Sequence, residues 1–146
     1  MDGRNERDLT LARKTAAQLV AEAKGQIENL DNDALAAEIE AGALIVDIRE
    51  PAEREQTGAI AGAVHVPRGL LEFVADPEYP LHREEFELDR RIVLHCATGG
   101  RSALATVALK NLGFTNVAHH EPGFNGWAAD GRPVEQLERQ WNDADE

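Results

Sequence analysis

The feature that most constrains the fold is the stretch 91–112, in which an apolar run stops at Cys96 and a helix-forming run follows a short loop. Residues 92–94 are apolar and mostly β-branched, which is typical of a strand buried on both faces of a sheet. Residues 102–112 are rich in Ala, Leu and Val and are followed by Gly113, which predicts a helix with a glycine stop. The sequence therefore predicts a strand, a loop and a helix N-terminus, with the single cysteine at the strand end.

The loop after Cys96 has the properties of an anion-binding site. Amide groups at a helix start lack intrahelical partners, and the helix macrodipole adds roughly half a positive charge there. Gly99 and Gly100 adopt φ > 0 at low cost, so the loop can turn several N–H groups toward one point. Such surroundings stabilise a thiolate, which predicts that Cys96 is a nucleophile at neutral pH. The alternative is an inert core cysteine, but we find no packing purpose for the Gly-Gly-Arg-Ser run that follows it.

The spacing between cysteine and arginine distinguishes two chemistries. Cysteine phosphatases have five residues between them, whereas only residues 97–100 separate Cys96 from Arg101, and Ser102 occupies the phosphatase arginine position. A shorter loop encloses a smaller bound group, such as one additional sulfur atom on the cysteine. The segment resembles the rhodanese (thiosulfate sulfurtransferase) family, whose active loop reads Cys-x-x-Gly-x-Arg-Ser in many bacterial single-domain members, with Gly99 at the glycine position.

The resemblance implies a set of site residues. Cys96 is the expected catalytic residue, and the expected substrate-binding residues are those of the loop: Ala97, Thr98, Gly99, Gly100, Arg101 and Ser102. Asp47 lies in an apolar run and is costly to bury without partners. The Asp-x-Arg-Glu pattern that it begins resembles the rhodanese segment that braces the active loop. Arg49 either points toward the site or pairs with an acid, and Arg68 either lies at the pocket rim or is a solvated loop arginine.

The activity implied by the resemblance is thiosulfate sulfurtransferase (rhodanese)-type transfer. The Cys96 thiolate takes the outer sulfur of a small anionic donor such as thiosulfate and forms a persulfide. An external thiol, cyanide or a protein then accepts the sulfur, because the chain has no second cysteine. No organic cofactor is implied. No metal is expected either, since His119 and His120 have no acidic or cysteine partner at ligand spacing.

The alternation of apolar strands and helices predicts an α/β domain with a mainly parallel central sheet flanked by helices, and ligands at the carboxyl ends of its strands. The predicted strands are 27–30, 43–48, 64–68 (running into a loop), 92–94 and 115–119. The predicted helices and helical turns are 9–23, 34–39, 51–55, 70–74 and 102–112. The first of these is an extra N-terminal helix that covers the domain's own core or, alternatively, serves dimerisation or partner docking.

The family resemblance covers residues 27–134. This range is the expected rhodanese-like domain, preceded by an N-terminal helical extension (1–26) and followed by an acidic C-terminal tail (135–146). His65 is expected to be a hydrogen-bonded core residue and Trp127 to fill the core. Near Trp127 the pattern departs from the family, because Pro122 stands where a glycine is common.

Composition excludes several classes of function. At 146 residues the chain is expected to form one domain, and its net charge of −12 argues against nucleic acid as a partner. No apolar run approaches the roughly 20 residues of a membrane span. The charged N-terminus does not resemble a signal peptide, and a single cysteine favours the reducing cytoplasm.

Three alternative functions remain open. A non-catalytic rhodanese-fold binding or regulatory module is one, although the retention of Cys96 with its Gly-Gly-Arg loop weighs against it. A cysteine phosphatase or arsenate reductase would use the same kind of loop, but this loop is one residue short. A redox sensor would use an oxidisable thiol, but the chain has no resolving cysteine.

Overall fold

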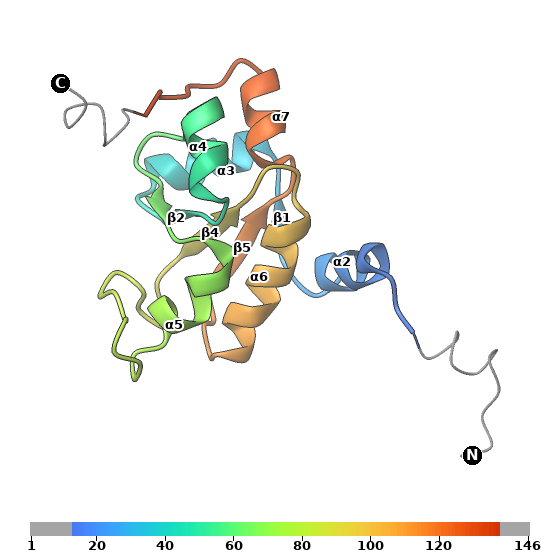
Figure 1. Ribbon diagram of the computed structural model, residues 1–146, viewed down its shortest axis with the longest axis vertical. Coiled ribbons are helices and arrows are strands. Elements are labelled where there is room, and N and C mark those ends of the chain that lie inside the picture. The colour runs from blue at the N-terminus through green and yellow to red at the C-terminus, as the bar shows by residue number, and fades with distance from the viewer. Residues whose placement is uncertain (1–12, 138–146) are drawn as a thin grey trace.

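The computed structural model describes residues 13–137, and a sheet of five parallel strands forms its centre (Figure 1). The strands are β1 (Glu28–Leu30), β2 (Leu44–Asp47), β3 (Val64–His65), β4 (Ile92–His95) and β5 (Val117–His120). Their order across the sheet is β1-β5-β4-β2-β3, and every neighbouring pair is parallel. The predicted parallel α/β architecture is therefore confirmed, with β4, which ends one residue before Cys96, in the middle of the sheet.

Helices cover both faces of this sheet. They are α2 (Ala16–Lys24), α3 (Asn32–Glu40), α4 (Pro51–Thr57), α5 (Leu71–Ala75), α6 (Gly100–Asn111), α7 (Gly123–Ala129) and the 3₁₀ turn η1 (Arg68–Leu70). Helices α5 and α6 pack on one face, and α3 and α7 pack on the other (Figure 1). Helix α2 lies outside these layers and contacts α6.

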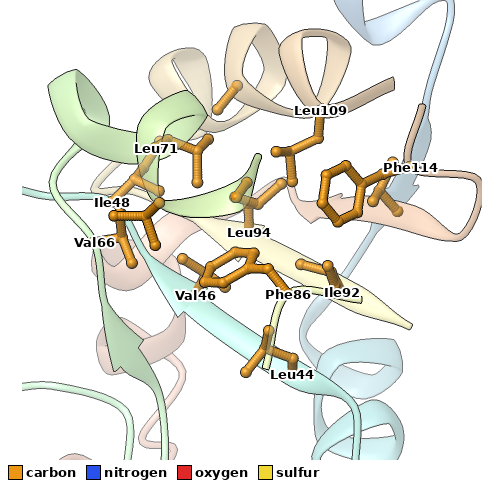
Figure 2. Packing of buried hydrophobic residues seen from close by; sticks show 14 of the residues in the cluster. Leu44, Val46, Ile48, Val66, Leu71, Phe86, Ile92, Leu94, Leu109 and Phe114 are labelled. Carbon is orange, nitrogen blue, oxygen red and sulfur yellow. The ribbon is translucent and has the colours of Figure 1, made fainter. Parts of the chain in front are cut away.

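The core has two parts because successive residues of a strand point to opposite faces. In β2, Leu44 and Val46 pack into the larger cluster under α5 and α6, which Figure 2 shows, while Ile45 packs under α3 and α7. Every residue of β2, β4 and β5 is buried. A strand buried on both faces explains the unbroken apolar runs of the sequence.

The N-terminal helix begins later than predicted. The Thr15 side chain accepts a hydrogen bond from the Gln18 amide and the Gln18 side chain accepts one from the Thr15 amide, so this capping box starts α2 at Ala16. Residues 9–12 of the predicted helix lie outside the described residues, as do residues 138–146 of the predicted tail.

Most other predicted elements are present with shifted ends. The predicted turn at 51–55 continues to Thr57 as α4, and α6 begins at Gly100, two residues before the predicted helix. The sequence did not predict α7, because a helix of seven residues that contains Gly123 and Gly126 has low intrinsic propensity. Its first turn is hydrogen-bonded to the loop after Cys96.

Of two predicted core residues, Trp127 is buried, whereas His65 makes the expected hydrogen bond but is only half-buried. The His65 Nε2 atom lies 2.7 Å from the Arg49 carbonyl oxygen, as expected of a hydrogen-bonded histidine. Trp127 is buried and donates from Nε1 to the Pro133 carbonyl oxygen. Within residues 13–137, no helix has the length and apolar character needed to cross a membrane.

Candidate active site

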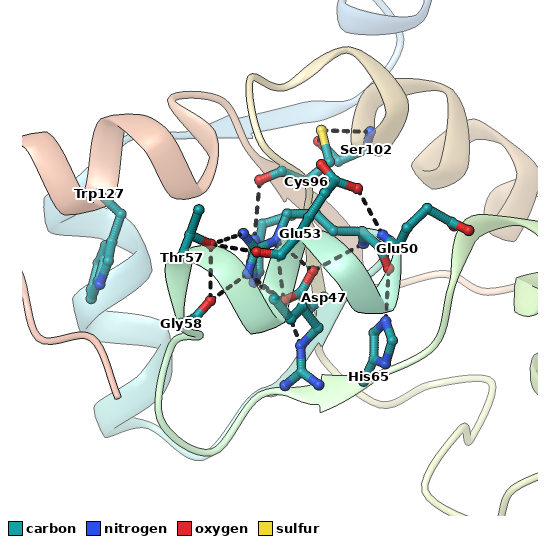
Figure 3. Close-up of polar contacts among 12 residues, drawn as sticks. Asp47, Glu50, Glu53, Thr57, Gly58, His65, Cys96, Ser102 and Trp127 are labelled. Carbon is teal, nitrogen blue, oxygen red and sulfur yellow. Dashed lines mark hydrogen bonds and ion pairs between the residues drawn. The ribbon is translucent and has the colours of Figure 1, made fainter. Parts of the chain in front are cut away.

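Cys96 follows the last residue of the central strand β4, at the carboxyl edge of the sheet (Figure 3). Asp47 ends the neighbouring strand β2 and is in register with His95, so the two predicted site segments lie side by side. The predicted loop is present between Cys96 and α6. Of its two glycines only Gly99 has positive φ, at +92°, while Gly100 is the first residue of the helix.

The Cys96 sulfur accepts hydrogen bonds from the loop. The backbone nitrogen atoms of Gly99 and Ser102 lie 3.1 and 3.4 Å from Sγ, and the Ser102 hydroxyl oxygen lies 3.5 Å away. Burial raises the pKa of the Cys96 thiol, but the Ser102 side chain and the amides of Ser102, Thr98 and Gly99 outweigh it, so that the pKa is lowered. The loop therefore favours the thiolate, which is the nucleophilic form.

The sulfur is enclosed by the ring of backbone N–H groups that the loop forms around it. Cys96 is only 1% exposed, whereas Thr98 at the tip of the loop is exposed. The thiol is therefore more enclosed than an exposed redox-sensor cysteine. Two backbone N–H groups converge on the enclosed sulfur.

The first turn of α7 is hydrogen-bonded to the backbone of the loop. The Phe124 amide donates to the Cys96 carbonyl oxygen at 2.7 Å, and the Asn125 amide donates to the Ala97 carbonyl oxygen at 3.0 Å. Gly123 has φ of +71°, and a Cβ atom there would approach the Ala97 oxygen to 2.3 Å. The glycine that this turn requires is thus Gly123, and Pro122 takes an ordinary φ of −63° in front of it.

Arg101 lies at the rim of the ring and is bound by an acid that the sequence analysis missed. Its two terminal nitrogen atoms donate to the two carboxylate oxygens of Glu53 in α4, both at 2.8 Å. These bonds raise the pKa of Arg101, and the charge of the Cys96 thiolate raises it further. Hydrogen bonds from Arg101 lower the pKa of Glu53 to about 2. The guanidinium is therefore close enough to interact with both charges.

A signal for Glu53 was present in the sequence. The Glu50-Pro51-Ala52-Glu53 run forms a capping box, in which the Glu53 side chain accepts from the Glu50 amide at 2.8 Å. This box fixes Glu53 in the first turn of the helix after β2. That turn lies at the same edge of the sheet as Cys96 (Figure 3).

Asp47 and Arg49 form a buried pair beneath the loop. The Asp47 carboxylate accepts from the Arg49 amide and guanidinium and, at 3.0 Å, from Arg54 Nε. Arg49 also donates to the Thr57 hydroxyl and lies 4.1 Å from the ring centre of Phe124. Of the two alternatives for Arg49, the structure shows that it pairs with an acid.

Arg68 does not join this group. It begins η1, and its guanidinium pairs with Glu72 one turn later, at 2.7 Å. Among the described residues, no polar contact links Arg68 to the loop around Cys96. No cluster of three or more His, Cys, Asp or Glu side chains suited to a metal is found between residues 13 and 137.

Ser102 also contacts a histidine that the sequence analysis weighed only as a metal ligand. Its hydroxyl lies 2.9 Å from Nδ1 of His119 on β5, and both residues are fully buried. The spacing of Ser102 and His119 in the sequence gives no sign of this contact, because it depends on how α6 crosses the end of β5.

Comparison with known proteins agrees with this architecture. Residues 31–130 match the model of the rhodanese-like domain family. A sulfurtransferase of Allochromatium vinosum is 35% identical over 91 residues, covering 62% of this chain and 77% of the relative. Thiosulfate sulfurtransferase 16 of Arabidopsis thaliana is 35% identical over 98 residues, covering 64% of this chain and 81% of the relative.

A solved structure from Rhodopseudomonas palustris has the same fold, with a TM-score of 0.79 and 38% identity. The similarity covers 84% of this chain and 95% of that one, a protein of unknown function described as a possible tyrosine phosphatase. The family match spans more than half of the sequence, and relatives at this level of identity include sulfurtransferases, which supports sulfur transfer in general. The chain belongs to the rhodanese-like domain family.

Proposed function

We propose that the chain is a sulfurtransferase in which Cys96 accepts the sulfane sulfur of an anionic donor such as thiosulfate. The single observation that supports this most is the ring around Sγ, where two amides and the Ser102 hydroxyl meet the sulfur and lower the pKa of its thiol. A thiolate held this way attacks the outer sulfur of thiosulfate. The new bond joins Cys96 Sγ to that sulfur, and the old sulfur–sulfur bond breaks with its electron pair leaving on sulfite.

The persulfide then lies inside the loop. Its outer sulfur carries the negative charge, and preorganised amide donors of this kind are each worth about 3 kcal/mol of transition-state stabilisation. Arg101 adds a positive charge at the rim, and Glu53 fixes the direction of its guanidinium. An external thiolate, cyanide or a protein thiolate attacks the outer sulfur, and Cys96 leaves as the thiolate.

A second candidate follows from the Rhodopseudomonas palustris structure, which is described as a possible tyrosine phosphatase. Phosphoryl transfer would use the same ring of amides and the same cysteine. The four-residue spacing between Cys96 and Arg101 favours sulfur over the larger phosphoryl group. A binding module without activity is the third possibility that the experiment must separate.

The test is intact-mass measurement of the reduced protein after treatment with thiosulfate. Sulfur transfer predicts a gain of one sulfur atom, which cyanide removes as thiocyanate and which Cys96→Ser abolishes. Turnover of an aryl phosphate without sulfur loading would favour the phosphatase. A protein that gains no sulfur and turns over no phosphate would be a binding module.

A further inference from the structure

A continuous line of hydrogen bonds runs from the Cys96 sulfur to the edge of the sheet. Sγ lies 3.5 Å from the Ser102 hydroxyl, that hydroxyl lies 2.9 Å from His119 Nδ1, and His119 Nε2 lies 2.8 Å from Oδ1 of Asn29. The four residues come from the end of β4, from α6, from β5 and from β1. Because the line leads away from the donor side of the loop, the sulfur-transfer steps above do not use it.

Asn29 fixes the direction of this line. Its amide nitrogen donates to the carbonyl oxygens of Lys24 and Ile27, at 2.9 and 3.1 Å, so its oxygen faces His119. An amide oxygen only accepts, and His119 Nε2 must therefore carry a proton. In the neutral imidazole Nδ1 is then an acceptor. It accepts a hydrogen bond from the Ser102 hydroxyl, and the Ser102 oxygen in turn accepts a hydrogen bond from the S–H group of Cys96.

When Cys96 loses its proton, these hydrogen bonds can no longer all be made. Ser102 has one hydroxyl proton and cannot donate it both to the thiolate and to a neutral His119. Either the thiolate or the buried imidazole nitrogen would then lose a partner, and an unpaired buried group is costly. A proton on Nδ1 removes the conflict. His119 then donates to Ser102, Ser102 donates to the thiolate, and Nε2 still donates to Asn29.

We propose that His119 is a positioning residue that takes up the Cys96 proton through Ser102 when the nucleophile forms. The S–H proton passes to the Ser102 oxygen while the Ser102 proton passes to His119 Nδ1, which yields a thiolate and an imidazolium. When the acceptor has removed the sulfur, the proton returns to Cys96 by the same route. The proposal rests on the proposed function in that Cys96 is the nucleophile.

The charges around His119 suit a base that is neutral before the reaction. Burial and then the Lys24 ammonium on α2 lower its pKa to about 4, while Glu121 opposes them. Lys24 and Glu121 also pair with each other, at 3.4 Å. The neighbouring His120 points to the other face of the sheet, where Nε2 meets Asn32. Before the nucleophile forms, the His119 ring is therefore neutral and its Nδ1 atom is free to accept a proton.

The experiment compares the pH profile of Cys96 alkylation by iodoacetamide, followed by intact mass, in four proteins: wild type, Ser102→Ala, His119→Gln and His120→Gln. Glutamine accepts the Ser102 hydroxyl bond but takes up no proton. We expect His119→Gln and Ser102→Ala to move the profile about one pH unit upward, which is about tenfold less thiolate at neutral pH. His120→Gln on the same strand is the matched control and leaves the profile in place.

A direct measurement follows the His119 ring. Nitrogen NMR of labelled histidine should show an imidazolium when Cys96 is deprotonated, and no such change in Cys96→Ser. A wild-type alkylation profile in His119→Gln, or a neutral His119 beside the thiolate, would overturn the relay. Alkylation needs no sulfur donor, so failure of sulfur loading in a protein with the expected profile would instead reject the proposed function.

Discussion

Two arginine–carboxylate pairs flank the Cys96 loop, and they differ in their access to solvent. The Asp47–Arg49 pair beneath the loop is 0% and 1% exposed, and neighbouring donors and acceptors complete its hydrogen bonds. The Glu53–Arg101 pair at the rim has exposed fractions of 33% and 40%. The same chemistry therefore serves two purposes. Removing one partner of a buried pair is strongly destabilising. A solvated pair contributes little to stability, but it affects the charge of the neighbouring Cys96 thiolate.

The largest expected effect comes from breaking the buried pair. Arg49→Met leaves the Asp47 carboxylate buried with Arg54 as its remaining basic partner, and we expect the free energy of unfolding to fall by about 3 kcal/mol. Urea denaturation measures it. Arg68→Met is the matched control, because Arg68 pairs with the partly exposed Glu72, and should cost less than about 1 kcal/mol. Equal losses in the two variants would remove the distinction between buried and solvated pairs.

The backbone between the two pairs offers the next test. A Cβ atom at Gly99 would lie 2.4 Å from the Glu121 carbonyl oxygen at a φ of +92°, so Gly99→Ala adds a backbone clash to an unfavourable conformation. We expect a loss of about 2 kcal/mol in unfolding free energy, together with loss of sulfur loading.

Gly42→Ala separates the two causes of that loss. Gly42 has a similar φ of +87°, but nothing lies within 4 Å of a Cβ atom there. Its variant should lose only about 1 kcal/mol and keep sulfur loading. Normal loading in Gly99→Ala would show that the loop does not need this backbone conformation.

The sequence predicted the arrangement of the candidate site better than the contacts that support it. Cys96, its loop and the buried Asp47 were found because they lie in contiguous patterns with a physical cost or benefit of their own. The direction of Arg49 stayed open although Asp47 is two residues away, since its further partners Thr57 and Phe124 come from other segments. Helix α7 was missed because Gly123 is needed for close approach to the loop and Gly126 for close approach to Pro122, which propensity cannot show.

Acid should weaken the interior before it affects the rim pair. Burial is the largest cause that lowers the pKa of His120, to about 3 from an ordinary 6.5, and burial also lowers that of His95 beside Asp47. The unfolded chain therefore binds more protons below pH 6.5. The contribution of these histidines to the free energy of unfolding is fully present above pH 6.5 and is lost as the pH falls toward 3. His120 alone contributes a loss of about 1 kcal/mol between pH 6.5 and 5.5.

The Glu53–Arg101 pair at the rim is affected by pH only in a more acidic range. The pKa of Glu53 is about 2 instead of 4.5, so its contribution is lost only as the pH falls below about 4.5. Urea midpoints at pH 7 and 5.5 measure the histidine contribution without that of Glu53. His120→Gln should reduce the difference between them, and an unchanged difference would mean that His120 does not cause the loss.

The smallest effect on stability, and the one that tests the rim pair most directly, comes from Arg101→Met and Glu53→Gln. Both should change the free energy of unfolding by less than about 1 kcal/mol, because the pair is solvated. They should move the pH profile of Cys96 alkylation in opposite directions. Loss of the Arg101 charge destabilises the thiolate and shifts the profile upward. Loss of the Glu53 charge leaves Arg101 uncompensated and shifts it downward. Shifts of the same sign, or a large loss of stability, would mean that the rim pair holds the loop together as the buried pair does.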